Sequence, residues 1–338
     1  MKKIMACLVI MAALIGCSKS DDQGGGLSTP ENTLPKKNDD HGGKTLPKGV
    51  FPKKIAHKAE NGNISYEITN NVQGEKILST TSISYKRDGS IESKILISFS
   101  YEGDYPKEAT YKRSKTNGEN ENYTETYSFV DGKLKNTTLK HDTNPRATKT
   151  TTYSYHNDGK LAKVLVEELR KSSLNGQIME DIYVTETDYT HIGNVTSAAE
   201  KRYTKDAQGN KRDGNTSLTT YTYTFENDNL IKVTESTTDH ESTTEYTYDG
   251  KNNPNLQNLK KLVDPDYFIS ASGSKNNILT QKTTYKGSHN NANPYVSEYV
   301  YEYTYADNNY PLTEKVFRKR TENGVEKKEL DHTTEYTY

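Results

Sequence analysis

Cys17 occupies the position in the sequence that most clearly indicates a chemical role. It follows a positive start at Lys2 and Lys3 and an apolar run, Ile4 to Ile15. A charged start, a short apolar run and a small residue at its end are typical of a secretory signal. The run has about 12 residues, too few for a helix that crosses a bilayer of roughly 30 Å. We therefore expect an export signal over residues 1–16, with the thiol of Cys17 as the reactive group next to it.

The residues around this cysteine support acylation. Leu14-Ile15-Gly16-Cys17 resembles the lipobox of bacterial lipoproteins. The resemblance implies that the thiol receives a diacylglycerol, that the chain is cut before Cys17, and that the new amine gains a further acyl chain, such as palmitate. More than one acyl chain gives stable membrane anchoring. The sequence therefore predicts a lipoprotein whose membrane partner is reached through its N-terminal lipid.

The residues after Cys17 indicate a destination. Lys19, Asp21 and Asp22 are similar to the lipoprotein export signal of Bacteroidota, although Ser20 separates the lysine from the acidic pair. The similarity implies recognition by lipoprotein sorting machinery and display on the outer face of the outer membrane. The alternative is a merely hydrophilic tether, which would leave the protein facing the periplasm.

No motif indicates catalysis. The sequence has no G-x-S-x-G, H-E-x-x-H, G-x-G-x-x-G or P-loop pattern. Cys7 would leave with the signal and Cys17 would be acylated, so no thiol remains for a disulfide or a zinc site. Asp264-Pro265-Asp266 could supply paired carboxylates for glycoside hydrolysis, but a proline here more simply ends a helix. We expect a protein that is not an enzyme and has no cofactor, with a cryptic glycosidase as an alternative.

Histidines are scattered through the chain, without the i, i+4 spacing of a helical metal site. They are His41, His57, His141, His156, His191, His240, His289 and His332. His240-Glu241 and Asp331-His332 are neighbours in predicted strands, so the two side chains of each pair should point to opposite faces. We expect structural roles for these histidines and no metal site.

Composition indicates an all-β protein. The 338 residues carry a formal net charge of −1, and signs are interspersed, so no basic face for nucleic acid stands out. The chain has 26 tyrosines, which combine an apolar ring with a polar hydroxyl and suit a sheet whose surface is partly exposed to solvent. Threonine, also abundant, favours strands. Residues 17–50 have linker composition, with Gly24-Gly25-Gly26 and several prolines, and predict a flexible tether; residues 51–338 form the folded domain.

Residues 51–338 contain short runs in which aromatic and polar residues alternate, as in Tyr221-Thr222-Tyr223-Thr224-Phe225. Such alternation puts the rings on one face of a strand and the hydroxyls on the other. Nine Asn-Gly or Asp-Gly pairs, which tolerate positive φ at both central positions of a hairpin turn, punctuate these runs. They begin at Asn61, Asp88, Asn117, Asp131, Asp158, Asn175, Asp213, Asp249 and Asn323. Nine hairpins predict up to about 18 strands.

Runs and turns combine into a recurring unit of aromatic-x-aromatic, a short polar turn, and leucine. Tyr153-Ser154-Tyr155 leads to Leu161 in this way, and Tyr127-Ser128-Phe129 leads to Leu134. The unit resembles the YD repeat of RHS-type proteins. Residues 60–338, with Tyr246 to Pro254 and Glu335-Tyr336-Thr337-Tyr338 as the most similar pieces, resemble a Bacteroidota lipoprotein family of unknown function with a porin-like β fold. The resemblance implies a fold and carries no functional residues.

We therefore expect an antiparallel meander of short hairpins that forms a large curled sheet or half-barrel. One short helix is expected near 255–263, where Leu256, Leu259, Leu262 and Val263 share a face, and it could plug an end of the sheet. Residues 165–174 fit helix or strand. Alternation lasts only three to seven residues before a charge enters, so we do not expect the strands to span a membrane. The last strand, 336–338, should pair within the sheet or across a barrel closure.

Function follows less directly. Asparagine-rich insertions at 252–255, 275–277 and 289–294 are candidate binding loops or plain connectors. We expect a surface lipoprotein that binds a glycan, a host protein or a partner protein, with an outer-membrane transporter as a partner if it serves uptake. The alternative is a structural or envelope-assembly lipoprotein that faces the periplasm.

Overall fold

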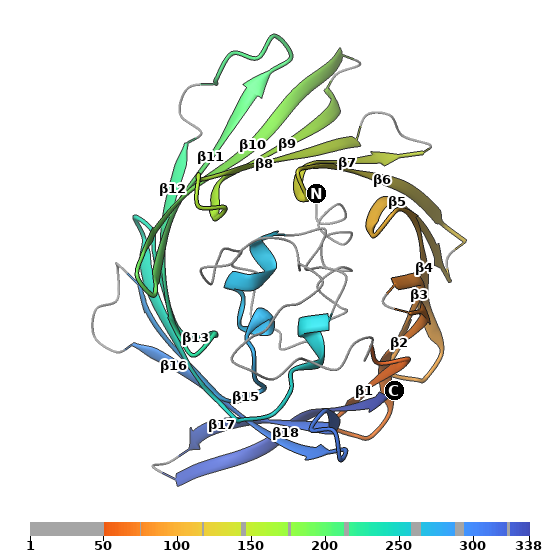
Figure 1. Cartoon of the computed structure of the whole chain (residues 1–338), viewed down its shortest axis with the longest axis vertical. Coiled ribbons are helices and arrows are strands. Elements are labelled where there is room, and N and C mark those ends of the chain that lie inside the picture. Colours follow the sequence, from red (N-terminus) through yellow and green to blue (C-terminus); the bar gives the residue numbers. More distant parts are fainter. Residues whose placement is uncertain are drawn as a thin grey trace.

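The computed structural model describes residues 51–74, 76–116, 118–142, 147–174, 177–212, 216–257, 265–287, 294–322 and 325–338. They form 18 antiparallel strands, each paired with its sequence neighbours (Figure 1). The strands are β1 (Lys54–Ala59), β2 (Ile64–Gln73), β3 (Lys76–Tyr85), β4 (Ile91–Glu102), β5 (Tyr105–Lys115), β6 (Asn120–Val130), β7 (Lys133–His141), β8 (Ala147–Tyr155), β9 (Leu161–Leu174), β10 (Gln177–Ile192), β11 (Val195–Asp206), β12 (Ser217–Glu226), β13 (Asn229–Ser236), β14 (His240–Tyr248), β15 (Ile278–Gly287), β16 (Tyr295–Tyr305), β17 (Pro311–Glu322) and β18 (Val325–Thr337).

The sheet closes into a full barrel. β1 pairs with β2 on one side and with β18 on the other, so that Ile55 lies opposite both Ile68 and Tyr336. These three side chains are buried together at the seam. The expectation of a half-barrel was therefore wrong, and the expected pairing of the last strand across a closure is confirmed. Closure has a physical reason: it removes both exposed strand edges of the meander.

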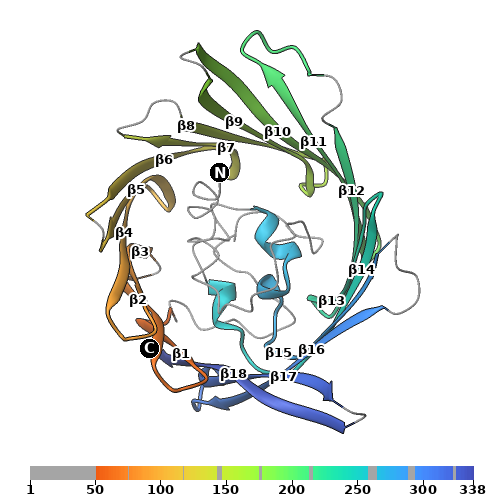
Figure 2. The same ribbon diagram turned by 180° about the vertical axis from the view of Figure 1, so that it is seen from behind.

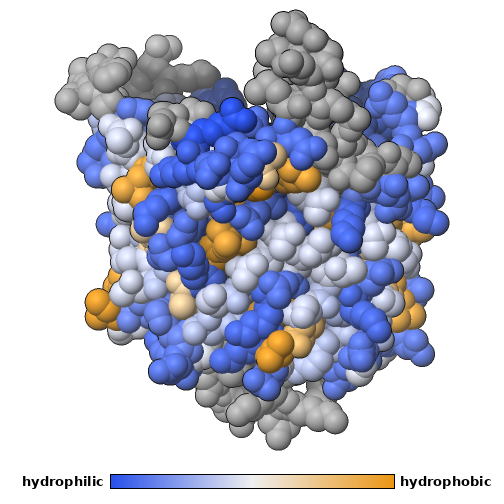
Figure 3. Space-filling view, turned by 90° about the horizontal axis from the view of Figure 1, so that it is seen from above, coloured by the Kyte–Doolittle hydropathy of each residue, from blue (hydrophilic) through white to orange (hydrophobic). Residues whose placement is uncertain are grey.

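The two faces of the barrel differ in polarity. In β12, Tyr221 and Tyr223 are buried, whereas Thr220 and Thr222 point to the other face. Ile269, from a segment within the ring, belongs to the same buried cluster as these tyrosines, so the apolar face is the inner one (Figure 1). The visible outer surface is mainly hydrophilic, with small separate apolar groups (Figure 3). Exposed large apolar residues in the described chain stand mostly at strand ends: Ile91, Val130, Tyr183, Ile192, Leu218, Tyr285, Tyr295, Val296 and Leu312.

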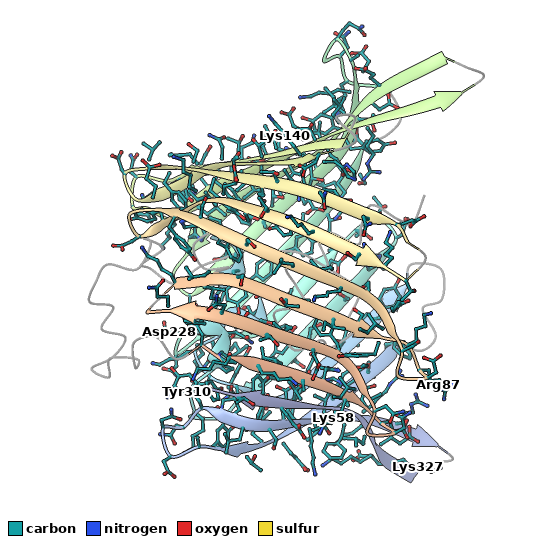
Figure 4. The ribbon with its side chains drawn as sticks, turned by 90° about the vertical axis from the view of Figure 1, so that its right-hand side faces the viewer. Lys58, Arg87, Lys140, Asp228, Tyr310 and Lys327 are labelled. Carbon is teal, nitrogen blue, oxygen red and sulfur yellow. The ribbon has the colours of Figure 1, made fainter. Side chains whose placement is uncertain are left out.

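The barrel has two distinct rims. At one, which we call the plug rim, β1 begins and the even-numbered strands end; Asp228 and Tyr310 lie there (Figure 4). At the other, the far rim, lie Arg87 and Lys327. The first strand, β1, thus begins at the same rim at which the last strand, β18, ends.

The turns follow two patterns rather than the single one expected. Asp131 and Gly132 both have positive φ (51° and 74°), as do Asn227 and Asp228 (51° and 63°). At Asp158-Gly159 only Gly159 has a positive φ. Its amide donates to the carbonyl of His156 (2.9 Å), so this is an ordinary β-turn that ends on a glycine in the left-handed conformation. Asn61-Gly62 and Asp88-Gly89 behave in the same way. Asp249-Gly250 makes no hairpin at all, because a long inward segment follows it.

That inward segment, which we call the plug, comprises the described residues 249–257 and 265–277. It lies inside the ring from either side of view (Figures 1 and 2). It contains three short 3-10 helices, η1 (Pro254–Gln257), η2 (Pro265–Ile269) and η3 (Ala271–Gly273). Of the short helix expected near 255–263, residues 255–257 lie in the 3-10 helix η1, and the remainder lies outside the described residues. Residues 165–174 belong to strand β9, because Val164 and Val166 continue the inward alternation.

No helix among the described residues is long and apolar enough to cross a bilayer.

Because β1 closes the barrel, we expect the stability of the protein to be sensitive to substitutions in this strand. Ala56 lies between Glu335 and Glu67 and is buried, so Ala56→Pro removes an amide from a strand that is paired on both sides. We expect a loss of about 3 kcal/mol in unfolding free energy and oligomers formed through the freed edges. Thermal unfolding and size-exclusion chromatography measure both.

Glu60→Pro is the matched control. Glu60 sits at the first central position of the next turn, where Gly62 donates to the carbonyl of Ala59 (2.8 Å) and proline is well tolerated. Equal stability of the two variants would contradict the importance of closure.

Candidate functional site

The residues with an expected chemical role lie outside the described part of the chain. These are Cys17, the acylation site, and the sorting residues Lys19, Asp21 and Asp22. Asp264, of the candidate carboxylate pair, and residues 289–293 of the third asparagine-rich insertion also lie outside it. A candidate site must therefore be built from what the barrel itself places together.

The repeating unit is explained by a hydrogen bond at the plug rim. The hydroxyl of Tyr155, at the end of β8, donates to the carbonyl of Leu134, at the start of β7 (2.8 Å). Tyr248 makes the same bond to Leu230 (2.6 Å). Each leucine is buried in the core. The tyrosine ring thus packs inside while its tip binds a backbone acceptor at a strand end, which is why tyrosine rather than leucine occupies this position.

The plug is fastened to the same rim through Asp249. Its Oδ1 accepts hydrogen bonds from the amides of Lys251 (2.9 Å) and Asn277 (3.1 Å), and its Oδ2 accepts one from the hydroxyl of Tyr305. Burial and this hydrogen bond to the carboxylate both raise the pKa of Tyr305. One side chain therefore joins both ends of the plug to strand β16.

Asparagines complete the attachment. The side-chain amide of Asn253 donates to the carbonyls of Ser272 (3.0 Å) and Ser274 (2.7 Å) inside the plug. Asn229, in β13, and Asn276 bind each other, with Asn229 Nδ2 donating to Asn276 Oδ1 and the Asn276 amide donating to Asn229 Oδ1 (both 3.0 Å). The described asparagines of 252–255 and 275–277 thus hold the plug in place through hydrogen bonds.

The inner face also carries charge. Carboxylates and cations on the face shared with the core form close pairs: Arg113 with Glu121 (3.5 Å), Arg170 with Glu168 (2.8 Å), Arg202 with Glu200 (2.7 Å) and His240 with Glu235 (3.2 Å). All lie toward the far rim from the buried apolar core residues of the described strands. Burial raises the pKa of Glu200, and Arg202 opposes the shift. The inner face is therefore apolar near the plug and charged toward the far rim.

Exposed rings gather where β14 to β17 reach the far rim. Tyr285 and Tyr295 lie opposite each other and are 42% and 58% exposed. The ring of His240 stacks on Tyr285 (5.1 Å between centroids, 25° between planes), and Arg318 Nη2 donates to the Tyr295 hydroxyl (2.9 Å). We call these four residues the aromatic patch. It offers ring faces and a cation within one sheet surface, above the buried Glu235, whose carboxylate binds His240 (3.2 Å).

Glu314 is the most unusual titratable group of the described inner face. It is half-buried on β17, where Tyr336 donates to its Oε2 (3.1 Å) and Tyr303 also hydrogen-bonds to it. Burial raises the pKa of this carboxyl to about 7, and the two hydrogen bonds oppose that shift. The group therefore changes charge near neutral pH inside the barrel.

The described histidines do not gather at one site, although His57 meets His332 and His156 meets His191. His156 and His191 sit at the plug rim, and His240 belongs to the aromatic patch. His332 contradicts the expectation that its side chain and that of Asp331 point to opposite faces, because its Nδ1 lies 2.7 Å from Asp331 Oδ2. The reason is a β-bulge: Val316 pairs with His332 and Phe317 with Leu330, which leaves Asp331 as an extra residue. In the described chain no three His, Cys, Asp or Glu side chains converge as a metal site.

Taken together, these features define an up-and-down β-barrel with a polar outer face, an inward plug at one rim and an aromatic, charged surface toward the other. No family model matches the sequence, and no curated protein matches it. Solved structures similar to it include a porin-like protein from Bacteroides uniformis ATCC 8492, at 12% identity and a TM-score of 0.39, covering 87% of this chain and 99% of that one. A porin-like protein from Bacteroides vulgatus ATCC 8482 is similar at 13% identity and a TM-score of 0.35, covering 85% and 98%. At such scores the likeness carries no argument about function.

Glu314 predicts a pH dependence of stability. Its folded pKa of about 7 exceeds the ordinary 4.5, so its contribution is fully present below pH 4.5 and is lost as the pH rises through 7. Glu314→Gln keeps an acceptor for the tyrosines without a charge. We expect the variant to gain about 3 kcal/mol over the wild type as the pH rises from below 4.5 to above 7. Denaturant unfolding across that range measures the difference.

Glu302→Gln, on the outer face of β16, is the control and should show no such trend. A stability difference between Glu314→Gln and the wild type that is constant with pH would contradict the assignment.

Proposed function

We propose that this protein is a lipid-anchored, water-exposed barrel at the outer membrane that binds a ligand outside the cell without chemically changing it. The observation that carries the proposal is the polarity of the barrel, with tyrosines and leucines inside and threonines, lysines and glutamates outside. Such a barrel is stable in water and needs a separate attachment to remain at a membrane. The lipobox-like sequence ending at Cys17 supplies that attachment.

The outer face argues against strands that cross a lipid bilayer. Glu245 and Lys282 lie opposite each other on outward positions of β14 and β15, in the middle of their strands, and Lys282 also faces Glu298. A lysine at the midplane of a lipid-facing strand costs about 2–4 kcal/mol. Similar pairs recur around the described barrel, as at Glu302 and Lys315. A membrane-spanning barrel would instead need an apolar outer band about 25 Å tall.

The position of β1 supports one orientation. The tether would enter β1 at the plug rim, so this rim faces the membrane and the far rim faces away. A flexible tether of about 30 residues has an r.m.s. reach of roughly 30 Å, enough to lift the barrel off the lipid surface. Display outside the cell follows from Lys19, Asp21 and Asp22, which resemble a sorting signal.

The aromatic patch is the surface best suited to a ligand. Exposed tyrosine faces stack on the apolar faces of sugar rings, and Arg318 can hydrogen-bond to sugar hydroxyls. A glycan is therefore our leading ligand class. An outer-membrane transporter is a fitting partner if the bound glycan is a nutrient.

Cys17→Ala tests the anchor. We expect this variant to leave the membrane fraction while its thermal unfolding stays as in the wild type, because residues 51–338 form the barrel without the lipid. Cell fractionation and circular dichroism measure the two effects.

In intact wild-type cells the barrel should be digested by added protease, whereas replacement of Lys19, Asp21 and Asp22 by alanine should protect it. A wild-type protein that resists protease on intact cells, while a surface marker is cut, would disprove outward display.

Tyr285→Ala and Tyr295→Ala test the ligand surface. Once a glycan array has identified a ligand, we expect each change to weaken its binding about tenfold, equivalent to about 1.4 kcal/mol. Tyr183→Ala is the control, because Tyr183 is also 42% exposed but lies on β10 under the guanidinium of Arg170 (4.4 Å), outside the patch. Isothermal titration calorimetry measures the affinities. If both patch variants bound the ligand as tightly as the wild type, the aromatic patch would not be the ligand-binding surface.

A further inference from the structure

Arg318, the arginine of the aromatic patch, has no counter-charge of its own. It lies on the inner face of β17, two positions after the buried Val316, and its Nη2 donates to the hydroxyl of Tyr295 (2.9 Å). The residue opposite it on β18 is Glu329, but that carboxylate pairs with Arg320 (3.6 Å). Within the described chain, Arg318 therefore has a neutral hydroxyl as its partner and no carboxylate.

The other described arginines show the contrast. Five of them form ion pairs: Arg113 with Glu121 (3.5 Å), Arg170 with Glu168 (2.8 Å), Arg202 with Glu200 (2.7 Å), Arg212 with Asp181 (2.5 Å) and Arg320 with Glu329 (3.6 Å). The sixth, Arg87, lies fully in solvent in the turn between β3 and β4, whereas Arg318 is half-buried. A charge that is partly removed from water is stabilised by an opposite charge, so Arg318 is suited to an anion that the described chain does not supply.

Most of the hydrogen-bonding capacity of Arg318 is open to such an anion. A guanidinium carries five N–H donors in one plane, and the bond to Tyr295 uses one of them. Two parallel N–H groups match the two oxygens of a carboxylate, which is planar as well. Such a bidentate pair gives geometric selection in addition to charge attraction, and a lysine ammonium cannot form it.

The exposed rings of the patch lie next to this guanidinium. Tyr295, which accepts the hydrogen bond from Arg318, lies opposite Tyr285, and the ring of Tyr285 stacks on His240. Glu235 is buried beneath and is engaged by His240 (3.2 Å), so it does not compete for the arginine. A sugar ring on the face of Tyr295 therefore has its substituents beside the guanidinium.

We propose that the aromatic patch binds an acidic glycan, and that Arg318 pairs with the carboxylate of a uronic acid residue whose ring stacks on Tyr295. This assignment rests on the proposed glycan-binding function and names the class of glycan. The tyrosine rings contact acidic and neutral sugars alike. Arg318 distinguishes between them, because its charge and its planar donors favour a sugar that carries a carboxylate.

An ion pair at an exposed surface also has a characteristic response to salt. Dissolved ions screen the attraction between Arg318 and a carboxylate, whereas stacking of a sugar on a tyrosine ring carries no net charge. Binding of an acidic glycan should therefore weaken between about 50 mM and about 500 mM NaCl, and binding of its uncharged counterpart should not.

The experiment uses the chain from residue 17 onward with Cys17→Ala. The probes are oligogalacturonate, oligomannuronate and hyaluronan fragments, each compared with its methyl ester, which keeps the sugar backbone and removes the charge. We expect at least one acid to bind about tenfold more tightly than its ester in titration calorimetry. Arg318→Gln should weaken binding of that acid about tenfold and leave the ester unchanged. Arg318→Lys keeps the charge without the planar pair and should restore only part of the difference.

Arg87→Gln is the matched control, because it removes the same charge at the same rim but outside the patch (Figure 4). It should bind acid and ester as the parent does, and circular dichroism confirms that each variant is folded. Equal affinity for acids and esters, or equal effects of Arg318→Gln and Arg87→Gln, would overturn the acidic assignment and leave glycan binding standing. Binding of dextran sulfate through Arg318 without binding of any uronate would likewise overturn it. If neither acidic nor neutral glycans bind, the proposed function itself fails.

Discussion

The pairing of β1 with β18 is the interaction on which the rest of this structure depends. β1 is only six residues long, yet all six are matched in register with β18. Without that pairing the molecule would be an open sheet with two edges and no inside. With it, the tyrosines of the other strands gain a shared interior, the plug has a ring to fill, and Glu314 is partly removed from water. The short β1–β18 pairing thus determines which face of every strand is exposed to solvent.

Tyrosine is the residue that makes this interior possible with so few aliphatic side chains. A leucine in place of Tyr155 or Tyr248 would fill similar space, but it would leave a strand-end carbonyl of the neighbouring hairpin without its donor. Where two tyrosines meet a carboxylate, as Tyr111 and Tyr127 do at Glu125 (2.8 and 2.7 Å), the same hydroxyls allow a charge-bearing group inside the barrel. The core is therefore a hydrogen-bonded aromatic layer, and its polarity is compatible with a barrel that is also polar outside.

The sequence predicts the number and alternation of the strands well, because both depend on local features such as turn residues and period-two patterning. It does not predict closure, since β1 (KIAHKA) has no aromatic alternation and its partner is the distant end of the chain. Asp249-Gly250 shows a similar limit: the pair looks like any other turn, and only the bonds of Asp249 to Tyr305 and Asn277 make it the start of a plug. Likewise the bulge at Asp331 cannot be read from strand periodicity. The candidate anchor was visible in the sequence alone, whereas the aromatic patch depends on how the strands β14 to β17 are paired, because that register brings its four residues together.

The seam also has a consequence for how the protein is made. Lys58 and Glu335, which join β1 to β18 across the closure, are 277 positions apart. β1 is the first strand of the barrel to be synthesised, and β18 is the last. Contacts of such sequence separation form slowly, so the first strand remains unpaired on one side until β18 has been made. Loss of β18 would leave the ring open and would expose strand edges that can pair with other chains.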